Sequence, residues 1–157
     1  MKSKLYLETS IISYLAARPS RDLIVAAHQQ ITAEWWERSR HRFNLYTSEL
    51  VIQEAGAGDL EAANRRLEFL AGLPSLNINE KVMILAIALL DARAVPQQAV
   101  EDAYHIALAA VHGMDYLLTW NCKHIANATM WSRIGGICRA QGYEPPAIAT
   151  PEQLQEE

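Results

Sequence analysis

Three carboxylates and one amide, widely separated in the sequence, are the strongest candidates for chemistry: Glu8, Glu54, Asp102 and Asn121. Their oxygens suit a hard cation such as Mg²⁺, which usually takes one or two carboxylates together with waters and substrate phosphates. Clustered carboxylates repel one another unless a proton, solvent or a metal offsets their charge. A metal would put that charge to use, because it activates water and stabilises a phosphoryl transition state.

Each of these residues alone also has an ordinary structural explanation. Glu8 can be a solvated strand end, and Glu54 can lie on the surface of a helix. Asp102 can be a first-turn acid favoured by the helix dipole, and Asn121 can be a turn residue. The prediction of a shared site therefore depends on the elements that position the four side chains.

Strand and helix patterns alternate along the chain. Short apolar segments predict strands at 4–8, 43–47, 76–78, 114–119 and 147–150. Helical spacing, caps and breakers predict helices over 11–17, 22–40, 48–55, 60–70, 80–92, 96–112 and 126–139, with Thr9 or Ser10 capping the first. This alternation predicts an α/β fold with a mostly parallel sheet covered on both faces, as a single domain over residues 1–157.

The predicted sheet places the candidate residues at one edge, since ligands of open α/β sheets bind at the carboxyl ends of strands. Glu8 ends the first strand, and Asn121 lies just past the fourth. Glu54 lies on the helix that begins where the second strand ends, and Asp102 lies on the helix that leads into the fourth. Asp115 precedes the fourth strand, so we expect it at the opposite edge and assign it no role.

The composition is that of a globular protein, with 157 residues, 50% hydrophobic and 20% charged. The net charge of −4 argues against a purely electrostatic nucleic-acid binder. Two segments are nevertheless locally basic and are interpreted either as phosphate contacts or as solvated surface: 117–142, which has no acid, and 38–42. Without an apolar leader or a membrane-length apolar run, we expect a soluble cytoplasmic protein.

The two cysteines, Cys122 and Cys138, are not spaced as a CxxC pair. A zinc site that also used His124 is an alternative, but structural zinc sites usually have tighter ligand spacing. Ordinary thiols in a reducing compartment are the preferred interpretation.

Four motifs occur in the order in which they occur in PIN-domain proteins, and together they span nearly the whole chain. They are Leu5–Ser10, Thr47–Glu54, Asp102–Ala109 and Leu117–Asn121, followed by a closing segment Ile148–Glu152 that is also similar. The nearest resemblance is to the toxin-like, VapC-type ribonucleases of bacterial toxin–antitoxin pairs. It implies a three-layer α/β/α PIN-like fold with a central sheet of four to five strands.

The resemblance also implies roles for individual residues. Glu8, Glu54, Asp102 and Asn121 would be the catalytic residues and the ligands of Mg²⁺ or Mn²⁺. Ser10 and Thr119 would orient them. The implied reaction is endonucleolytic hydrolysis of RNA, by a homodimer that a cognate antitoxin restrains.

Two positions depart from the family pattern. Glu8 stands where the family usually has Asp, and Asn121 stands where it often has Asp. These changes favour an alternative function, a PIN-like module that binds RNA or protein with little or no cleavage. A flavodoxin-like phosphoacceptor or a nucleotide-binding domain is disfavoured, because no glycine-rich loop follows the first strand and no P-loop pattern occurs.

Residues near Asn121 are candidates for RNA contacts. Lys123 and His124 are interpreted either as phosphate contacts at the rim of the site or as an exposed loop. Trp120 is interpreted either as a base-stacking residue or, preferably, as a core residue. His105 and His112 share one helix face and are assigned to packing or to the surface.

Overall fold

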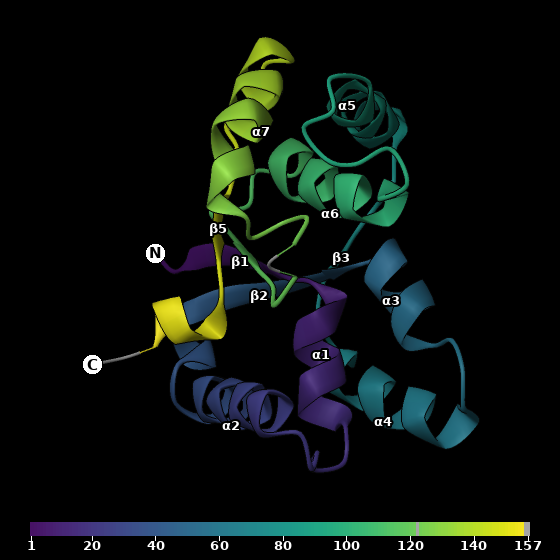
Figure 1. Ribbon diagram of the computed structural model, residues 1–157, viewed down its shortest axis with the longest axis vertical. Helices are drawn as coiled ribbons and strands as arrows, with labels where there is room; N and C mark the ends of the chain where they lie inside the picture. The colour runs from purple at the N-terminus through teal and green to yellow at the C-terminus, as the bar shows by residue number, and fades with distance from the viewer. Residues whose placement is uncertain (122, 156–157) are drawn as a thin grey trace.

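Five parallel strands form the centre of the computed structural model, which describes residues 1–121 and 123–155 (Figure 1). Their spatial order is β3-β2-β1-β4-β5. The strands are β1 (Ser3–Leu7), β2 (Phe43–Ser48), β3 (Ser75–Leu76), β4 (Tyr116–Leu118) and β5 (Ala147–Ala149). Every neighbouring pair is parallel, with Leu5 of β1 opposite both Leu45 of β2 and Tyr116 of β4. This confirms the predicted parallel sheet, and all carboxyl ends lie at one edge.

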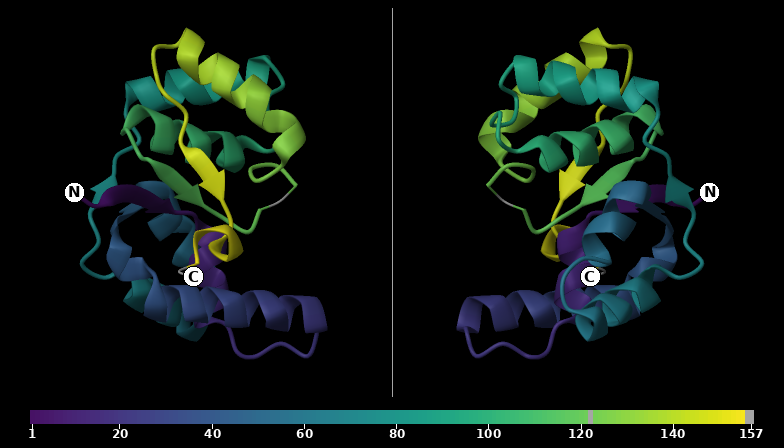
Figure 2. Two further views of the ribbon diagram at one scale, coloured as in Figure 1. Left: turned by 90° about the vertical axis from the view of Figure 1, so that its left-hand side faces the viewer. Right: turned by 90° about the vertical axis from the view of Figure 1, so that its right-hand side faces the viewer.

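Helices cover both faces of this sheet, which gives the predicted three layers (Figures 1 and 2). One face carries α1, α2 and α4, and the other carries α5, α6 and α7. Helix α3 contacts α1 and α4 as well as α6. The bounds are α1 (Thr9–Ala16), α2 (Leu23–Arg38), α3 (Glu49–Ala55), α4 (Leu60–Leu70), α5 (Glu80–Asp91), α6 (Val100–Val111) and α7 (Ala128–Ala140), with short 3₁₀ turns at η1 (Arg40–Arg42) and η2 (Pro151–Leu154).

The central strand β1 is apolar on both faces, as expected for a strand between two helical layers. Leu5, Tyr6 and Leu7 are all fully buried, although successive side chains point to opposite faces. Leu117 and Leu118 of β4 are buried in the same way. The core therefore lies on both sides of β1 and β4 and holds their carboxyl ends in fixed positions.

Side-chain caps fix the starts of α1 and α3, two helices next to the candidate residues. Ser48 Oγ accepts a hydrogen bond from Val51 N at the start of α3. The predicted cap of α1 was wrong: the cap is Glu8, whose carboxylate accepts a hydrogen bond from Ser10 N at 3.1 Å. Because β1 already ends at Leu7, Glu8 is the last extended residue before the helix and takes the capping position.

Three predicted boundaries also differ from the structure. Strand β3 ends at Leu76, because Ile78 N donates instead to Glu49 Oε2 at 2.8 Å. The helix predicted from Pro96 begins at Val100, after a turn in which Ala99 N donates to Pro96 O. Asp102 consequently lies in the first turn of α6. Strand β4 is limited to Tyr116–Leu118.

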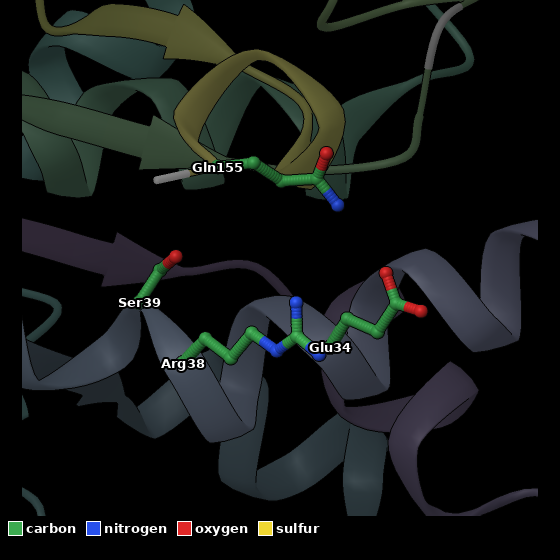
Figure 3. A pocket seen from close by; sticks show the side chains of 4 residues that line it. All are labelled: Glu34, Arg38, Ser39 and Gln155. Atoms are coloured by element: carbon green, nitrogen blue, oxygen red, sulfur yellow. The ribbon is translucent and has the colours of Figure 1, made fainter. Parts of the chain in front are cut away.

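The pocket drawn in Figure 3 lies away from the candidate residues. A small pocket between α2 and the segment after η2 is lined by Glu34, Arg38, Ser39 and Gln155, none of which is a candidate site residue (Figure 3). Among the described helices, none has both the length and the apolar character that a membrane crossing requires.

Candidate active site

The four predicted site residues come from four different segments around the carboxyl ends of β1, β2 and β4. A chain of hydrogen bonds that passes through Thr119 connects Glu8, Asn121 and Asp102. Thr119 Oγ1 donates to Glu8 Oε1, and Asn121 N donates to Thr119 Oγ1 at 2.9 Å. Asn121 Nδ2 then donates to Asp102 Oδ1 at 2.9 Å. Glu54 joins the group from α3, since Thr9, the neighbour of Glu8, donates to Glu54 Oε1 at 2.6 Å.

Glu8 is buried, with 6% of its surface exposed, and both of its carboxylate oxygens have partners. Oε1 accepts from the hydroxyls of Ser10 and Thr119, and Oε2 accepts from Ser10 N. Ser10 Oγ in turn accepts a hydrogen bond from Trp120 N at 2.9 Å. Ser10 and Thr119, the two predicted orienting residues, therefore hold Glu8 between β1 and β4.

Glu54 has one engaged oxygen and one open oxygen. Oε1 accepts from Thr9 Oγ1 and lies 2.7 Å from His105 Nε2. Oε2 has no hydrogen-bond partner within residues 1–121 and 123–155. Partial burial opposes ionisation of Glu54, but the hydrogen bonds from His105 and Thr9 and the charge of His105 outweigh it, so the pKa of Glu54 is lowered. The carboxylate is therefore ionised near neutral pH.

His105 contacts the site, although its place in the sequence predicted a packing or surface residue. It is 1% exposed, and its Nδ1 lies 2.7 Å from the Tyr6 hydroxyl. Burial opposes its protonation, but the hydrogen bond to Glu54 and the charges of Glu8, Glu54 and Asp102 raise the pKa of His105. The spacing of three residues from Asp102 was the available signal, because it puts both side chains on one side of α6.

Asp102 and Asn121 jointly fix His124. Asp102 Oδ2 lies 2.8 Å from His124 Nδ1, and Asn121 Oδ1 accepts from His124 N at 3.1 Å. The side chains of His124 and Asp102 are 24% and 17% exposed. Because Nδ1 faces the carboxylate, Nε2 is left without a hydrogen-bond partner in the described part of the chain.

Comparison with known proteins identifies the family. A sequence model described as the PIN domain matches residues 5–123, a range that contains all four candidate residues. The chain belongs to the PIN-domain family. The family is one of nucleases, and PIN-domain nucleases generally use divalent metal ions. A search of curated proteins found no match.

Two solved PIN structures have the same fold at low sequence identity. One is the VapBC2 protein of Rickettsia felis, solved bound to a DNA fragment from the promoter, with 15% identity and a TM-score of 0.59 over 93% of this chain and 97% of that one. The other is VapC20 of Mycobacterium tuberculosis, described as a Sarcin-Ricin loop cleaving toxin, with 14% identity and a TM-score of 0.59 over 91% and 100% of the two chains. These similarities confirm the PIN fold.

The PIN site offers oxygen donors but no preformed cage for a metal ion. No three His, Cys, Asp or Glu side chains within the described residues converge closely enough to bind one ion. A hard cation needs only one or two carboxylates, because waters and substrate phosphates complete its shell. The open Oε2 of Glu54 and the partly exposed Asp102 fit that requirement in donor type and accessibility.

The residues that flank the PIN site differ in their exposure. Lys123 is exposed, as a phosphate contact must be. Trp120 is instead buried: its Nε1 donates to Thr32 Oγ1 at 2.7 Å, and its ring stacks on His28 at 4.0 Å. This placement corresponds to the core alternative, and His28 occupies one face of the ring.

The two thiols do not form a described metal site. Cys122, one of the weighed zinc ligands, lies outside the described residues. Cys138 is buried in α7, where loss of solvent raises the pKa of its thiol to about 11. Cys138 is therefore a protonated core thiol.

Proposed function

We propose that this PIN-domain protein is an endoribonuclease of the cytoplasm, which hydrolyses RNA phosphodiester bonds with Mg²⁺ or Mn²⁺ as the toxin of a type II toxin–antitoxin pair. The observation that carries the proposal is the position of Glu8, Glu54 and Asp102 around one edge of the sheet, where hydrogen bonds through Thr9, Thr119 and Asn121 link their segments. The family supports nuclease chemistry. The descriptions of VapC20 and VapBC2 support the toxin assignment.

The metal would be held by oxygen atoms on separate elements. Glu54 offers its open Oε2, and Asp102 and Asn121 offer oxygens on partly exposed side chains. Glu8 would contribute charge from its buried position, with Ser10 and Thr119 fixing its direction. When bound, a divalent ion supplies Lewis acidity and an activated water for the attack on phosphorus.

RNA would enter over the segment that follows Asn121. His124 presents Nε2 at this rim with its ring fixed by Asp102, and Lys123 adds an exposed positive charge. Such groups position a phosphate backbone without reading its sequence. The exposed apolar side chains of α5, Met83, Ile84 and Ile87, support the proposal of a homodimer, because a free apolar patch often marks an interface.

The decisive test is RNA cleavage by an Asp102→Asn variant. Removing this charge should lower Mn²⁺-dependent cleavage by about a hundredfold or more, since a ligand should matter at least as much as the partners that orient ligands. The thermal midpoint should stay the same or rise, because the variant relieves carboxylate repulsion and Asn retains an acceptor for Asn121 Nδ2. Asp115→Asn is the matched control, because Asp115 accepts from Lys4 N at the far edge of the sheet.

One observation favours the alternative function, an RNA- or protein-binding module with little cleavage. All the carboxylate oxygens of Glu8 and Asp102 already accept hydrogen bonds from the protein or lie within hydrogen-bonding distance of a histidine. Wild-type protein that binds RNA but shows no cleavage with Mg²⁺, Mn²⁺ or other divalent ions would establish this alternative and exclude the nuclease.

A further inference from the structure

The buried ring of His105 has a partner at each nitrogen. Nε2 lies 2.7 Å from Glu54 Oε1, and Nδ1 lies 2.7 Å from the hydroxyl of Tyr6. The Tyr6 hydroxyl continues to Ser48 Oγ at 2.8 Å, and Ser48 Oγ accepts from Val51 N at 3.1 Å. The four side chains come from α6, α3, β1 and the end of β2, so the connection depends on the tertiary fold.

The partners fix the direction of the hydrogen bonds. An ionised Glu54 is an acceptor only, so His105 Nε2 must carry a proton and donate it. In the neutral ring, Nδ1 then accepts from Tyr6, and the Tyr6 oxygen accepts from Ser48. When the ring is charged, Nδ1 instead donates to the Tyr6 oxygen, and the Tyr6 hydroxyl donates to Ser48 Oγ. The bond from Nε2 to Glu54 is unchanged. His105 therefore donates to Glu54 Oε1 in both charge states.

These contacts form a closed circuit around α3. Ser48 caps the first turn of α3, and Glu54 lies in the last turn of the same helix. The circuit runs from Glu54 through His105 and Tyr6 to Ser48, and then along α3 back to Glu54. Tyr6 and His105 are both fully enclosed, and buried polar networks with every member satisfied are rigid. Glu54 Oε1 therefore has a fixed position relative to β1.

The result is an asymmetric carboxylate. Oε1 of Glu54 is held by His105 and Thr9, whereas Oε2 has no partner within the described residues. Glu8 and Asp102 differ, because each of their oxygens already has a protein partner. Among these three acids, Glu54 is the one that the described structure leaves with an open oxygen.

We propose that His105 is a positioning residue of the nuclease site: Tyr6 and Ser48 hold its ring, and it holds Glu54 Oε1 so that Oε2 is presented to the divalent ion. The inference rests on the proposed function, because positioning has a purpose only if the ion binds. Partners that orient a metal ligand typically change metal affinity by about tenfold to a hundredfold when they are removed. We expect His105 to have an effect of that size.

Two amide variants distinguish the role of His105 Nε2 from that of Nδ1. The amide nitrogen of His105→Gln reaches about as far as Nε2 and can still donate to Glu54, whereas His105→Asn places its amide near the position of Nδ1 and leaves Glu54 without this donor. In calorimetric titration with Mn²⁺, His105→Asn should bind at least about tenfold more weakly than wild type, and His105→Gln within about threefold. His112→Gln is the control, since His112 is the C-cap of the same helix and its Nε2 lies 2.8 Å from Asn77 O.

A second measurement needs no metal. In ¹⁵N-labelled metal-free protein, the His105 ring should show a proton on Nε2 that exchanges slowly with water, and Glu54→Gln should accelerate that exchange. Tyr6→Phe keeps the ring volume of Tyr6 but removes its hydroxyl, so it tests the far side of the circuit if both His105 variants fail to fold. Like His105→Asn, Tyr6→Phe should weaken Mn²⁺ binding relative to wild type.

The outcomes distinguish this inference from the proposed function. Equal Mn²⁺ affinity in wild type and His105→Asn, or an equal loss in the Asn and Gln variants, would reduce His105 to a structural role and overturn the inference alone. The same holds for Tyr6→Phe if only that variant folds and its affinity is unchanged. Wild-type protein that neither binds Mn²⁺ nor cleaves RNA would overturn the proposed function and the inference together.

Discussion

Two histidine–carboxylate pairs lie at the same edge of the sheet, and they differ in their surroundings. His105 and Glu54 are 2.7 Å apart, and His124 and Asp102 are 2.8 Å apart. The side chain of His105 is 1% exposed, whereas that of His124 is 24% exposed. In the first pair both ring nitrogens have protein partners, whereas in the second Nε2 has none among the residues that the structure describes.

This difference shows that the same histidine–carboxylate contact can serve two purposes. A ring enclosed by Tyr6, Glu54 and the sheet can only transmit position, because no substrate atom can reach it. A ring held at Nδ1 and open at Nε2 can contact a phosphate. We therefore interpret His105 as part of the frame of the site and His124 as part of its working surface.

The largest expected effect is a difference in stability between the pairs. Removing one member of a buried pair leaves the other unsatisfied, so His105→Ala should lower the free energy of unfolding by about 3 kcal/mol. His124→Ala should lower it by about 1 kcal/mol or less, because solvent replaces the lost partner. Urea denaturation of both variants with a chelator present measures the difference.

RNA cleavage should show that the exposed pair acts on substrate although it contributes little to stability. His124→Ala should lose about tenfold in cleavage despite its nearly normal stability, since a rim contact to phosphate acts mainly on substrate. Equal destabilisation by both substitutions, or wild-type cleavage by His124→Ala, would contradict the division into frame and working surface.

The sequence predicted the positions of the carboxylates and the amide of the site better than that of its buried histidine. Glu8, Glu54, Asp102 and Asn121 could be placed because the carboxyl ends of parallel strands meet at one edge, a rule that needs only the order of elements. His105 could not be placed, because it lies in an alanine-rich helix where an apolar environment is the simplest expectation. Its partners, Tyr6 and Glu54, are 99 and 51 residues away and are brought to it by packing alone.

Two predictions about the local structure were wrong for a similar reason. Thr9 or Ser10 was expected to cap α1 because hydroxyl residues are common caps. The position of the cap is set by where β1 stops, and pairing with β2 and β4 decides that. Likewise, β3 is short because Glu49, from the next layer, takes the hydrogen bond of Ile78 N. Such competition between local signals and distant partners cannot be read from a single segment.

A smaller effect is expected from Glu8→Asp, and it should reach only one of the two pairs. The shorter side chain retains its bond to Ser10 N but moves away from Thr119, which connects it to Asn121 and Asp102. Loss of one hydrogen bond should cost about 1 kcal/mol. In ring NMR spectra, the His124 signals should move and the His105 signals should stay. Cleavage that rises above wild type would show that Glu8 weakens the site.

Movement of both rings, or of His105 alone, would mean that Glu8 belongs to the buried circuit. The control is Glu49→Asp: Glu49 also accepts a backbone hydrogen bond, but from Ile78 at the start of the neighbouring loop. That variant should leave both ring spectra unchanged.

The smallest expected effect is a pH dependence of stability that belongs to the buried pair. The pKa of His105 is raised above its usual 6.5, so its contribution is complete below that value and is lost as pH rises through the folded pKa. The pKa of Glu54 is lowered from 4.5, so its contribution is present above that value and is lost as pH falls through the folded pKa. Stability of the metal-free protein should therefore be greatest in weakly acidic solution and should decline toward alkaline pH.

Variants at each pair identify the source of that decline. Glu54→Gln should flatten it, because Glu54 supplies both a hydrogen bond and charge to His105, while Glu8 and Asp102 retain a smaller share. His124→Gln should keep the wild-type profile, since the exposed ring lies outside the circuit. Urea midpoints at several pH values between 5 and 9 measure these slopes. Parallel profiles for wild type and Glu54→Gln would show that the buried pair does not couple protonation to folding, and the distinction between the two pairs would then be one of exposure alone.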